Sequence, residues 1–489
     1  MTYSKSLPPI ELSSLKRVHI IGVCGTLMGA FAAFLKRSGI EVTGSDQNIY
    51  PPMSDVLKNA GVRLFNGYRV ENLMANDQGI KPDLVVIGNV IRADNPEARA
   101  AMEGGMNYSS LPEAMETLFL KTTRNLVVAG THGKTTTSSL LAHILVSCGK
   151  SPNYFIGGVS HDLPFSFQIS ELKKGHPFVL EGDEYDTAFW DKVPKFNHYL
   201  PDDAILTSVE YDHADIYPDF NSVKRAFEGL ISRIRPGGKL IACFDHAVVR
   251  ELALQCKVPV LSYGTTLESQ ARFTLGKVQL GEGVSQFEII EGQKKIAEIS
   301  IQLPGMHNVL NALSVWIECR ELGLDPVQVQ KAFLSFRGVK RRQEIRGEVG
   351  GVMVMDDFAH HPTAVRETLK ALKLKYPKRR LITVFEPRSA TSRRKIFQAD
   401  YAEAFGKSDV TFISSPFDQS RIATDDQFSS EMLVDDIQKF SEVHLMVTIE
   451  EGAVAVAKIA RPGDLIAVLS NGGFGGFINK LLEALPKER

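Results

Sequence analysis

The sequence has few cysteines and no excess of charge of either sign, and each absence excludes classes of protein. Its five cysteines are scattered over 489 residues and form no C-x-x-C pair. An odd, dispersed set favours reduced thiols in a cytosol over a disulfide framework or a zinc site. The net charge is only −1, so the chain lacks a general electrostatic attraction to nucleic acid or to an anionic membrane. Repeats, low-complexity tracts and long charge runs are also missing.

Long hydrophobic runs are scarce as well, and the one candidate for a membrane segment is interrupted. Residues Val18–Leu35 are mostly apolar and follow two basic residues, which resembles a signal peptide or a short membrane span. However, Gly22, Gly25 and Gly29 interrupt this run, and a polar, strand-like stretch follows at residues 41–46. We therefore interpret the run as a strand, a glycine turn and a helix. We expect a cytoplasmic protein without membrane insertion.

The length of the chain and its alternating patterns predict an α/β protein of two to four domains. At 489 residues it is too long for one hydrophobic core. Strand-like and helix-like segments alternate in three stretches, and we expect domain boundaries at residues 1–122, 123–336 and 337–489. Residues 268–302 differ, since short apolar–polar alternations with glycine turns predict antiparallel hairpins there. The strands expected in the third stretch are Val352–Met355, Leu381–Phe385, Val410–Ile413, His444–Val447 and Leu465–Leu469.

The segment from Leu126 to Val146 has the layout of a phosphate-binding turn. An apolar strand-like run leads into the turn G-x-x-G-K-T, which begins at Gly130, and a helix-compatible run follows from Ser138. In such a turn the backbone N–H groups face the anion, the lysine reaches the terminal phosphates and the hydroxyl holds Mg²⁺. The usual motif has glycine at the place of Val128, so a plain glycine turn with a surface lysine is the alternative. The order of strand, turn and helix favours the nucleotide.

A second glycine-rich turn lies near the amino terminus, at Gly22–Gly29, between an expected strand and a helix expected over Ala30–Arg37. Asp46 lies 24 residues after Gly22, about where a dinucleotide-binding fold places its ribose-binding acid. Cys24 replaces the second glycine of G-x-G-x-x-G, so close packing of strand on helix explains the turn equally well. The turn predicts a nucleotide-type ligand rather than NAD in particular.

Acidic residues and a histidine follow two expected strands of the central stretch, and they predict metal sites. Glu181 comes after the strand at residues 178–180, and Asp212 with His213 comes after the strand at residues 204–206. The carboxyl ends of such strands are where an open α/β sheet builds its site. Because Mg²⁺ prefers hard oxygen ligands, Thr135 with Glu181 could hold one ion, and His213 could serve a second.

Two charge-rich segments flank the first expected strand of the third stretch, at residues 338–344 and 356–362. One interpretation is a solvated junction between domains. The other is that a separate domain carries an arginine and a histidine onto the nucleotide, where positive charge would stabilise a transferring phosphoryl group.

Taken together, these motifs resemble the Mur ligases, and they occur in that family's order along almost the whole chain. The matching segments are Gly130–Thr136, Glu181–Glu184, Asp212–His213, Pro304–Asn311 and Asp357–Pro362, with the Gly22–Gly29 turn before them. The resemblance implies a Rossmann-like UDP-sugar domain, a central P-loop ATPase domain and a C-terminal Rossmann-like domain. It also implies ATP-dependent formation of an amide bond through an acyl phosphate, with ATP and Mg²⁺ as cofactors.

Three further segments resemble one branch of this family. Glu184–Phe189, Phe385–Ser389 and Ser470–Gly476 look like the branch that joins a recycled tripeptide, L-alanyl-γ-D-glutamyl-meso-diaminopimelate, to UDP-N-acetylmuramate. The branch that adds free L-alanine to the same sugar is the alternative, and its usual sequence differs at all three segments. The implied partners are therefore small molecules, not nucleic acid.

The resemblance also implies a role for individual residues. Lys134 would hold phosphates together with the rest of the turn, Gly130, Thr131, His132, Gly133, Thr135 and Thr136. Thr135, Glu181 and His213 would bind metal, and the residues facing adenine, ribose, the phosphates and the acyl phosphate would be Asn308, Asp357, Arg342 and His360. The expected UDP-sugar contacts are Gly22, Cys24, Gly25, Thr26, Ser45, Asp46, Gly88 and Asn89. The expected peptide contacts are Arg388, Ser389, Asn471 and Gly472.

The chain departs from the family pattern at two places. The family often has Asn four residues before the Asp of Asp-His, and here that position is Ser208. Some relatives carry a carbamylated lysine fifteen residues after that His, but this chain has Glu228, whose carboxylate could act directly.

Two other classes of protein fit part of the pattern. A P-loop switch or motor would hydrolyse ATP without an acceptor amine. A nicotinamide-dependent dehydrogenase would explain the Gly22 turn but would leave Lys134 and His213 without a use.

Overall fold

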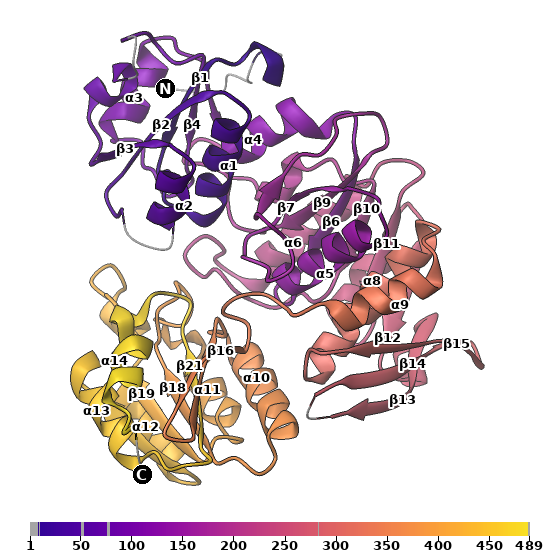
Figure 1. Ribbon diagram of the computed structural model, residues 1–489, viewed down its shortest axis with the longest axis vertical. Coiled ribbons are helices and arrows are strands. Elements are labelled where there is room, and N and C mark those ends of the chain that lie inside the picture. The colour runs from indigo at the N-terminus through magenta and orange to yellow at the C-terminus, as the bar shows by residue number, and fades with distance from the viewer. Residues whose placement is uncertain (1–7, 9, 50–52, 76–78, 282, 488–489) are drawn as a thin grey trace. The chain divides into compact units, whose positions relative to one another are not determined.

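The computed structural model describes residues 8, 10–49, 53–75, 79–281 and 283–487 (Figure 1). The chain forms two compact units, of which the first contains residues 1–210, 220–274 and 313–332. The second contains residues 211–219, 275–312 and 333–489. Within the described ranges, none of the helices combines the length and the hydrophobicity needed to cross a lipid bilayer.

The amino-terminal sheet of the first unit has five parallel strands in the order β3-β2-β1-β4-β5. They are β1 (Arg17–Ile21), β2 (Glu41–Asp46), β3 (Arg63–Asn66), β4 (Leu84–Ile87) and β5 (Tyr108–Ser110). The helices are α1 (Thr26–Arg37), α2 (Met53–Asn59), α3 (Pro96–Glu103) and α4 (Leu111–Met115). All four residues of β4 are fully buried, as expected for a central parallel strand.

Helix α1 begins at Thr26, four residues before the start expected at Ala30. The expectation was wrong because Gly29 is not a turn glycine. A Cβ atom at Gly29 would lie 2.2 Å from Sδ of Met53, so this glycine lets α2 pack closely against α1.

The central sheet carries the Gly130 turn. Its strands in the first unit run in the order β12-β11-β10-β6-β9-β7-β8, and all neighbours are parallel except β7 and β8 (Figure 1). The strands are β6 (Arg124–Ala129), β7 (Asn153–Phe155), β8 (Phe167–Gln168), β9 (Pro177–Gly182), β10 (Asp203–Leu206), β11 (Lys239–Cys243) and β12 (Val260–Gly264). The helices are α5 (Lys134–Ser147), α6 (Phe220–Ser232) and α7 (Ala247–Leu254). Because α5 packs against β6 and β9, its first turn stands at their carboxyl ends.

The antiparallel hairpins expected at residues 268–302 are confirmed. They consist of β13 (Phe273–Leu280), β14 (Ser285–Glu291) and β15 (Lys294–Ile301), with β14 and β15 antiparallel. Strand β13 starts in the first unit, where Phe273 pairs with Tyr263 of β12, and continues into the second. The helices that follow are α8 (Met306–Glu321) and α9 (Pro326–Ser335).

The carboxyl-terminal sheet has six strands in the order β16-β17-β21-β18-β19-β20, all parallel except β16. They are β16 (Glu344–Val349), β17 (Val352–Asp357), β18 (Leu381–Phe385), β19 (Val410–Ser414), β20 (Glu442–Met446) and β21 (Leu465–Leu469). The helices are α10 (Pro362–Lys375), α11 (Gln398–Ala404), α12 (Ser430–Gln438), α13 (Ile449–Ile459) and α14 (Phe477–Ala484). Alternate residues of β17 enter two separate cores, so helices cover both faces of this sheet.

Two details of this sheet differ from the expectation. Strand β16 was not expected, because it is a half-exposed edge strand without a buried apolar run. It joins β17 through Gly350 and Gly351, whose φ angles of 55° and 77° suit a tight hairpin. The strand expected at His444–Val447 begins two residues earlier and ends one residue earlier, at Glu442–Met446.

Candidate active site

The Gly130 turn joins β6 to α5 and depends on glycine at both of its bends. Gly130 has φ 134° and Gly133, at the amino end of α5, has φ 84°. A Cβ atom at Gly130 would lie 2.2 Å from Oγ1 of Thr207 and 2.9 Å from the backbone N of Ser208. The turn therefore excludes a side chain at Gly130 both by its backbone conformation and by its neighbours.

Lys134 is held inside this turn rather than projecting into solvent. Its ammonium donates to the backbone O of Gly130 (2.7 Å) and Thr131 (3.3 Å) and to both carboxylate oxygens of Glu184 (2.9 and 2.8 Å). Burial by itself would lower the pKa of Lys134, but the charges of Glu184 and Asp183 outweigh it and raise that pKa. Lys134 thus remains a cation at the end of the turn.

Thr135 and Glu181 are brought together as expected. The Thr135 hydroxyl donates to Oε1 of Glu181 at 2.8 Å, and the backbone N–H of Gly157 donates to Oε2 at 2.7 Å. A Cβ atom at Gly157 would lie 3.1 Å from both Glu181 oxygens. The pair presents two hard oxygen atoms beside the lysine, a donor set that suits Mg²⁺.

Residues after β10 hold the turn from the other side, and the sequence singled out only Ser208 among them. Thr207 donates its hydroxyl to the backbone O of His132 (2.6 Å), and the Ser208 hydroxyl accepts from the His132 N–H (3.0 Å). The Thr131 hydroxyl accepts from the Glu210 N–H at 2.8 Å. Ser208, which stands where the family often has Asn, therefore braces the turn.

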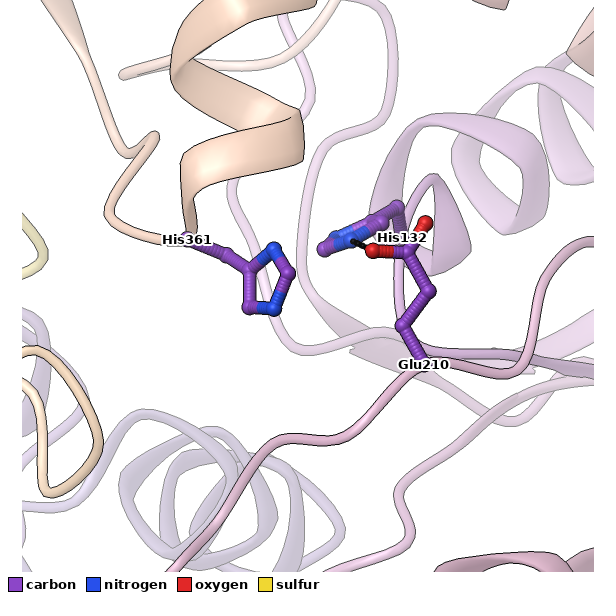
Figure 2. Close-up of side chains that lie close together, drawn as sticks. All are labelled: His132, Glu210 and His361. Carbon is purple, nitrogen blue, oxygen red and sulfur yellow. Dashed lines mark ion pairs between the residues drawn. The ribbon is translucent and has the colours of Figure 1, made fainter. Parts of the chain in front are cut away.

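His132 and Glu210 form the charged flank of the turn. Figure 2 shows the imidazole beside the carboxylate, with Nε2 and Oε2 3.5 Å apart. The pair is ionic when His132 is protonated. The third residue drawn, His361, belongs to the second unit.

In the second unit, Asp212 is the centre of a buried polar cluster. Its Oδ1 accepts from the Thr391 hydroxyl (2.6 Å) and from the His213 N–H (2.7 Å), and its Oδ2 lies 3.8 Å from Nε2 of His360. Burial would raise the pKa of Asp212, but His360 and the neighbouring imidazoles hold it well below its usual range. His213 itself has φ 55°, a strained value for histidine. Thr391 had no signal in the sequence.

His361 caps helix α10 and has a defined tautomer. Its Nδ1 accepts from the Thr363 N–H at 3.3 Å, while Nε2 lies 3.2 Å from the backbone O of Tyr211. Nε2 must therefore carry the proton and donate to that carbonyl. Its neighbour His360 uses Nδ1 toward the backbone O of Phe358, at 3.0 Å.

The adjacent arginines before β16 have different environments. Arg341 donates to the backbone O of Ser470 (2.6 Å) and Gly472 (2.7 Å), which ties the last loop in place. Arg342 is exposed, with its guanidinium 4.8 Å from the ring centre of Phe358. Arg342 is thus better placed than Arg341 to meet a ligand.

The side chains expected at adenine and ribose already form hydrogen bonds with the protein backbone. Asp357 accepts from the N–H groups of Gln343 and Ala359, both at 2.8 Å, and its burial raises the pKa of its carboxyl. Asn308 donates to the backbone O of Pro304 at 2.8 Å and is 7% exposed. Their contacts to a nucleotide stay predictions.

The residues expected at the peptide lie at the ends of β18 and β21. Arg388 stacks on Phe417, with Cζ 3.8 Å from the ring centre, and pairs with Glu386 at 3.3 Å. A Cβ atom at Gly472 would lie 2.0 Å from Nε of Arg388. In the part of the chain that the structure describes, Oδ1 of Asn471 is buried without a hydrogen-bond partner, which suits a ligand donor. Ser389 instead binds Ser392 in its own turn, at 2.9 Å.

Some residues expected to contact the UDP-sugar at the amino-terminal turn form hydrogen bonds within the protein. Gly22 (φ 81°) donates its N–H to the backbone O of Ser45 at 2.8 Å. The Cys24 N–H donates to Asp46 at 2.9 Å. The Ser45 side chain is fully buried and binds Glu97, so it supports the sheet.

The remaining residues expected at the UDP-sugar lie at the mouth of this turn. Gly25 and Thr26 are exposed at the start of α1, where backbone N–H groups attract anions. Gly88 and Asn89 follow β4, and the Gly88 N–H donates to the backbone O of Ile21 at 2.9 Å.

Comparison with known proteins places the whole chain in one family. Residues 17–122 match the model "Mur ligase family, catalytic domain", residues 128–318 the Mur ligase middle domain, and residues 341–472 "Mur ligase, glutamate ligase domain". The chain belongs to the Mur ligase family. The prediction of a three-domain α/β, ATP-dependent ligase that forms an amide bond is therefore confirmed.

Several Mur ligases match along nearly their full length. The UDP-N-acetylmuramate–L-alanyl-γ-D-glutamyl-meso-2,6-diaminoheptandioate ligase of Escherichia coli (strain K12) is 39% identical, over 96% of this chain and 99% of its own. A UDP-N-acetylmuramate–L-alanine ligase of Kineococcus radiotolerans is 34% identical over 94% of each chain. The crystal structure of a murein peptide ligase from Psychrobacter arcticus 273-4 is 31% identical, with a TM-score of 0.72 over 96% of this chain and 98% of its own.

Proposed function

We propose that this Mur ligase joins UDP-N-acetylmuramate to the tripeptide L-alanyl-γ-D-glutamyl-meso-2,6-diaminoheptanedioate and converts ATP to ADP and phosphate. The observation that carries the proposal is the 39% identity over 96% of the chain to the Escherichia coli ligase of that name. The segments Glu184–Phe189, Phe385–Ser389 and Ser470–Gly476 support the same branch. Such a reaction takes place on soluble substrates, so we place the protein in the cytoplasm.

Lys134 and the Gly130 turn would bind the ATP phosphates in this proposal. The turn offers the backbone N–H groups from Gly133 to Thr136 at the amino end of α5, where anions are stabilised. The hydrogen bonds of Lys134 to Gly130, Thr131 and Glu184 hold its cation in a fixed position before the nucleotide arrives. This preorganisation supports a role in phosphoryl transfer, where positive charge must already be in place.

Mg²⁺ would be held by Thr135 and Glu181, which already lie 2.8 Å apart. When bound, the ion would neutralise phosphate charge and so favour attack by a carboxylate. His213 would provide the second metal site, and Asp212 positions it through the His213 backbone N–H. The half-buried Glu228 of α6 remains the proposed replacement for a carbamylated lysine.

Four residues of the second unit also have proposed roles. We assign Arg342 to the phosphates, His360 to the acyl phosphate, Asn308 to adenine and Asp357 to ribose. The exposure of Arg342 supports its role, and the polar cluster around Asp212 and His360 supports the role of His360.

The chemistry follows from the poor reactivity of a carboxylate as an acyl donor. Transfer of the terminal phosphoryl group of ATP to the lactyl carboxylate of the sugar gives a mixed anhydride and ADP. The alanine nitrogen of the tripeptide then attacks the carbonyl carbon, phosphate leaves, and the nitrogen loses a proton. Both reactants of the first step are anions, which explains the need for Lys134 and the metal ions.

The other assignments complete the proposal. The UDP-sugar would bind the amino-terminal turn through Gly22, Cys24, Gly25, Thr26, Ser45, Asp46, Gly88 and Asn89. The peptide would bind Arg388, Ser389, Asn471 and Gly472. Residues 1–122, 123–336 and 337–489 would form the three domains.

The proposal is tested by identifying the product. The protein is incubated with ATP, Mg²⁺, UDP-N-acetylmuramate and the tripeptide, and the UDP-sugar tripeptide is measured by mass spectrometry with each component omitted in turn. We expect product and repeated release of ADP only when all are present. Repeated ADP release without the UDP-sugar and the peptide would indicate an ATPase switch, and an L-alanine adduct formed in preference to the tripeptide adduct would indicate the alanine-adding branch.

A further inference from the structure

A polar cavity of about 570 Å³ lies in the second unit, beyond the carboxyl end of β19. Its walls come from the turn η6 (Lys395–Phe397), from the first residue of α11, and from the loop that leads to α12. Its volume is in the range of small-ligand sites. None of the residues assigned above to ATP, metal, sugar or peptide lines it.

The wall of the cavity is built by side-chain amides that bind the backbone. Gln398 donates to the backbone O of Ser429 (2.9 Å) and accepts from the Ser429 N–H (3.0 Å). Gln419 donates to the backbone O of Arg393 (2.8 Å) and of Phe428 (3.0 Å). These bonds fix the loop in shape, so a ligand would find the cavity already formed.

The cavity presents charges of both signs that are not paired with each other. Lys395 and Asp425 line it and are exposed, and within the described residues neither side chain forms an ion pair or a hydrogen bond. Glu431, also in the lining, already accepts from the Ser429 hydroxyl at 2.9 Å. A ligand that carries an ammonium group beside a carboxylate would satisfy both residues. Its ammonium would donate a charge-assisted hydrogen bond to Asp425, and its carboxylate would accept one from Lys395.

We propose that this cavity binds the free end of the peptide's third residue, with Asp425 on its ammonium and Lys395 on its terminal carboxylate. The inference rests on the proposed function. A 2,6-diaminoheptanedioate joined through one amino group keeps an ammonium and a carboxylate on the same distal carbon. This pair of opposite charges matches the charges of Lys395 and Asp425 in the cavity lining. Free L-alanine lacks the third residue and so has no group that could bind there.

The cavity continues from the expected peptide site along one segment of chain. Pro416 lines the cavity, and the next residue, Phe417, carries the guanidinium of Arg388 on its ring. The Phe417 N–H also donates to the backbone O of Pro387 at 2.9 Å. A peptide whose inner carboxylate meets Arg388 would therefore extend its far end toward Lys395 and Asp425.

The test measures KM and kcat of Lys395→Gln and Asp425→Asn with the tripeptide, beside the controls Lys439→Gln and Asp435→Asn. The control positions are exposed on or beside α12 and do not line the cavity. Each cavity variant should raise KM for the tripeptide about tenfold, the effect of losing one charge-assisted hydrogen bond. The KM for UDP-N-acetylmuramate and kcat should stay within about twofold of wild type.

Altered peptides separate the two contacts. With L-alanyl-γ-D-glutamate, which lacks the third residue, both variants should have the same KM as wild type. With L-lysine as third residue, which keeps the ammonium but lacks the distal carboxylate, Asp425→Asn should still raise KM and Lys395→Gln should not. Unchanged KM for the tripeptide in both variants, or equal losses with the shortened peptide, would overturn the cavity assignment. Wild-type protein that does not use the tripeptide at all would instead overturn the proposed function on which it rests.

Discussion

The two ends of the central parallel sheet both gather charged residues, yet they do different things with them. At the carboxyl ends of β6, β9 and β10 stand Lys134, Glu181 and Glu184, in contact with glycine turns and backbone groups. At the amino ends of β6, β10 and β11 stand Arg124, Asp203 and Lys239, which contact one another. Strand β6 therefore positions one residue of each set, Arg124 at its start and Lys134 after its end.

The charged residues at the amino end contact one another. Arg124 pairs with Asp203 at 2.7 Å, Lys239 with Asp203 at 3.2 Å, and Lys239 lies 3.9 Å from Glu318 of α8. Burial, and then the charge of Asp203, raise the pKa of Glu318 to about 8. Glu318 lies in α8, so its contacts with these residues hold α8 to the sheet.

The difference shows that a cluster of charged residues indicates a ligand site only where some of its polar groups remain accessible to a ligand. At the carboxyl end, positive-φ glycines expose N–H groups and leave hard oxygens beside a fixed cation. At the amino end, every charge faces another side chain. We therefore expect substitutions at one end to affect catalysis and at the other to affect stability.

The largest effect is expected for Lys134→Ala. Loss of a preorganised cation at the transferring phosphoryl group should lower ADP release about 1,000-fold. The variant also leaves the buried Glu184 without its partner, so its stability should fall. Lys134→Ala should still bind the UDP-sugar almost as wild type does. Adding Glu184→Gln should restore the unfolding midpoint, measured by calorimetry, but not ADP release. Recovery of turnover in the double variant would contradict the role of Lys134.

Next comes a matched pair of glycines with positive φ. Gly130→Ala introduces a Cβ atom 2.2 Å from Thr207 and should reduce ADP release about 100-fold by distorting the turn. Gly237, before β11, has φ 88° and open space around it. Gly237→Ala should therefore cost only about 1 kcal/mol of backbone strain, read from urea unfolding, with normal activity. Equal losses of activity in both variants would remove the distinction between the two ends.

A smaller effect is expected at the metal pair. Thr135→Val keeps the shape of the side chain but removes the hydroxyl that contacts Glu181. The Mg²⁺ concentration for half-maximal ADP release should rise about tenfold, because one hard oxygen is lost. A Mg²⁺ titration at saturating ATP measures it, with Thr137→Val further along α5 as control. An unchanged Mg²⁺ requirement would argue against Thr135 as a ligand.

The smallest effect on catalysis, and a clear one on stability, is expected for Glu318→Gln. A carboxyl whose folded pKa is raised to about 8 keeps a proton in the folded chain that the unfolded chain releases near the ordinary glutamate pKa of 4.5. Stability from this group is therefore full below pH 4.5 and is lost as pH rises through 8. The variant should match wild type near pH 5 and exceed its thermal midpoint above pH 8, with unchanged turnover. A constant difference between the two proteins across this range would contradict the raised pKa.

The sequence revealed the parts of the site that are local in the chain. The Gly130 turn, Lys134 and Thr135 are contiguous, and Glu181 follows a short apolar strand, so pattern was enough to find them. Thr207 had no such signal, and Ser208 was noted only as a departure from the family pattern, because both act on the turn through the pairing of β10 with β6. Thr391 reaches Asp212 from 179 residues away, which no local pattern indicates.

The same distinction explains the fold. Fully buried parallel strands such as β4 and β21 were found from their apolar runs. The edge strand β16 was not, because its residues are half exposed and its pairing depends on the glycine hairpin to β17. Gly29 was taken for part of a turn because only the contact of α1 with α2 explains it. The Glu318 cluster was invisible, since its four residues come from four separate elements.

The central claim is tested most directly by comparing kcat/KM for ADP release with the tripeptide and with free L-alanine, at saturating ATP and UDP-N-acetylmuramate. We predict a ratio of at least about 100 in favour of the tripeptide, because its additional polar groups meet a site built to bind them. A ratio at or below one would contradict the proposed function and assign the chain to the alanine-adding branch of the Mur ligases.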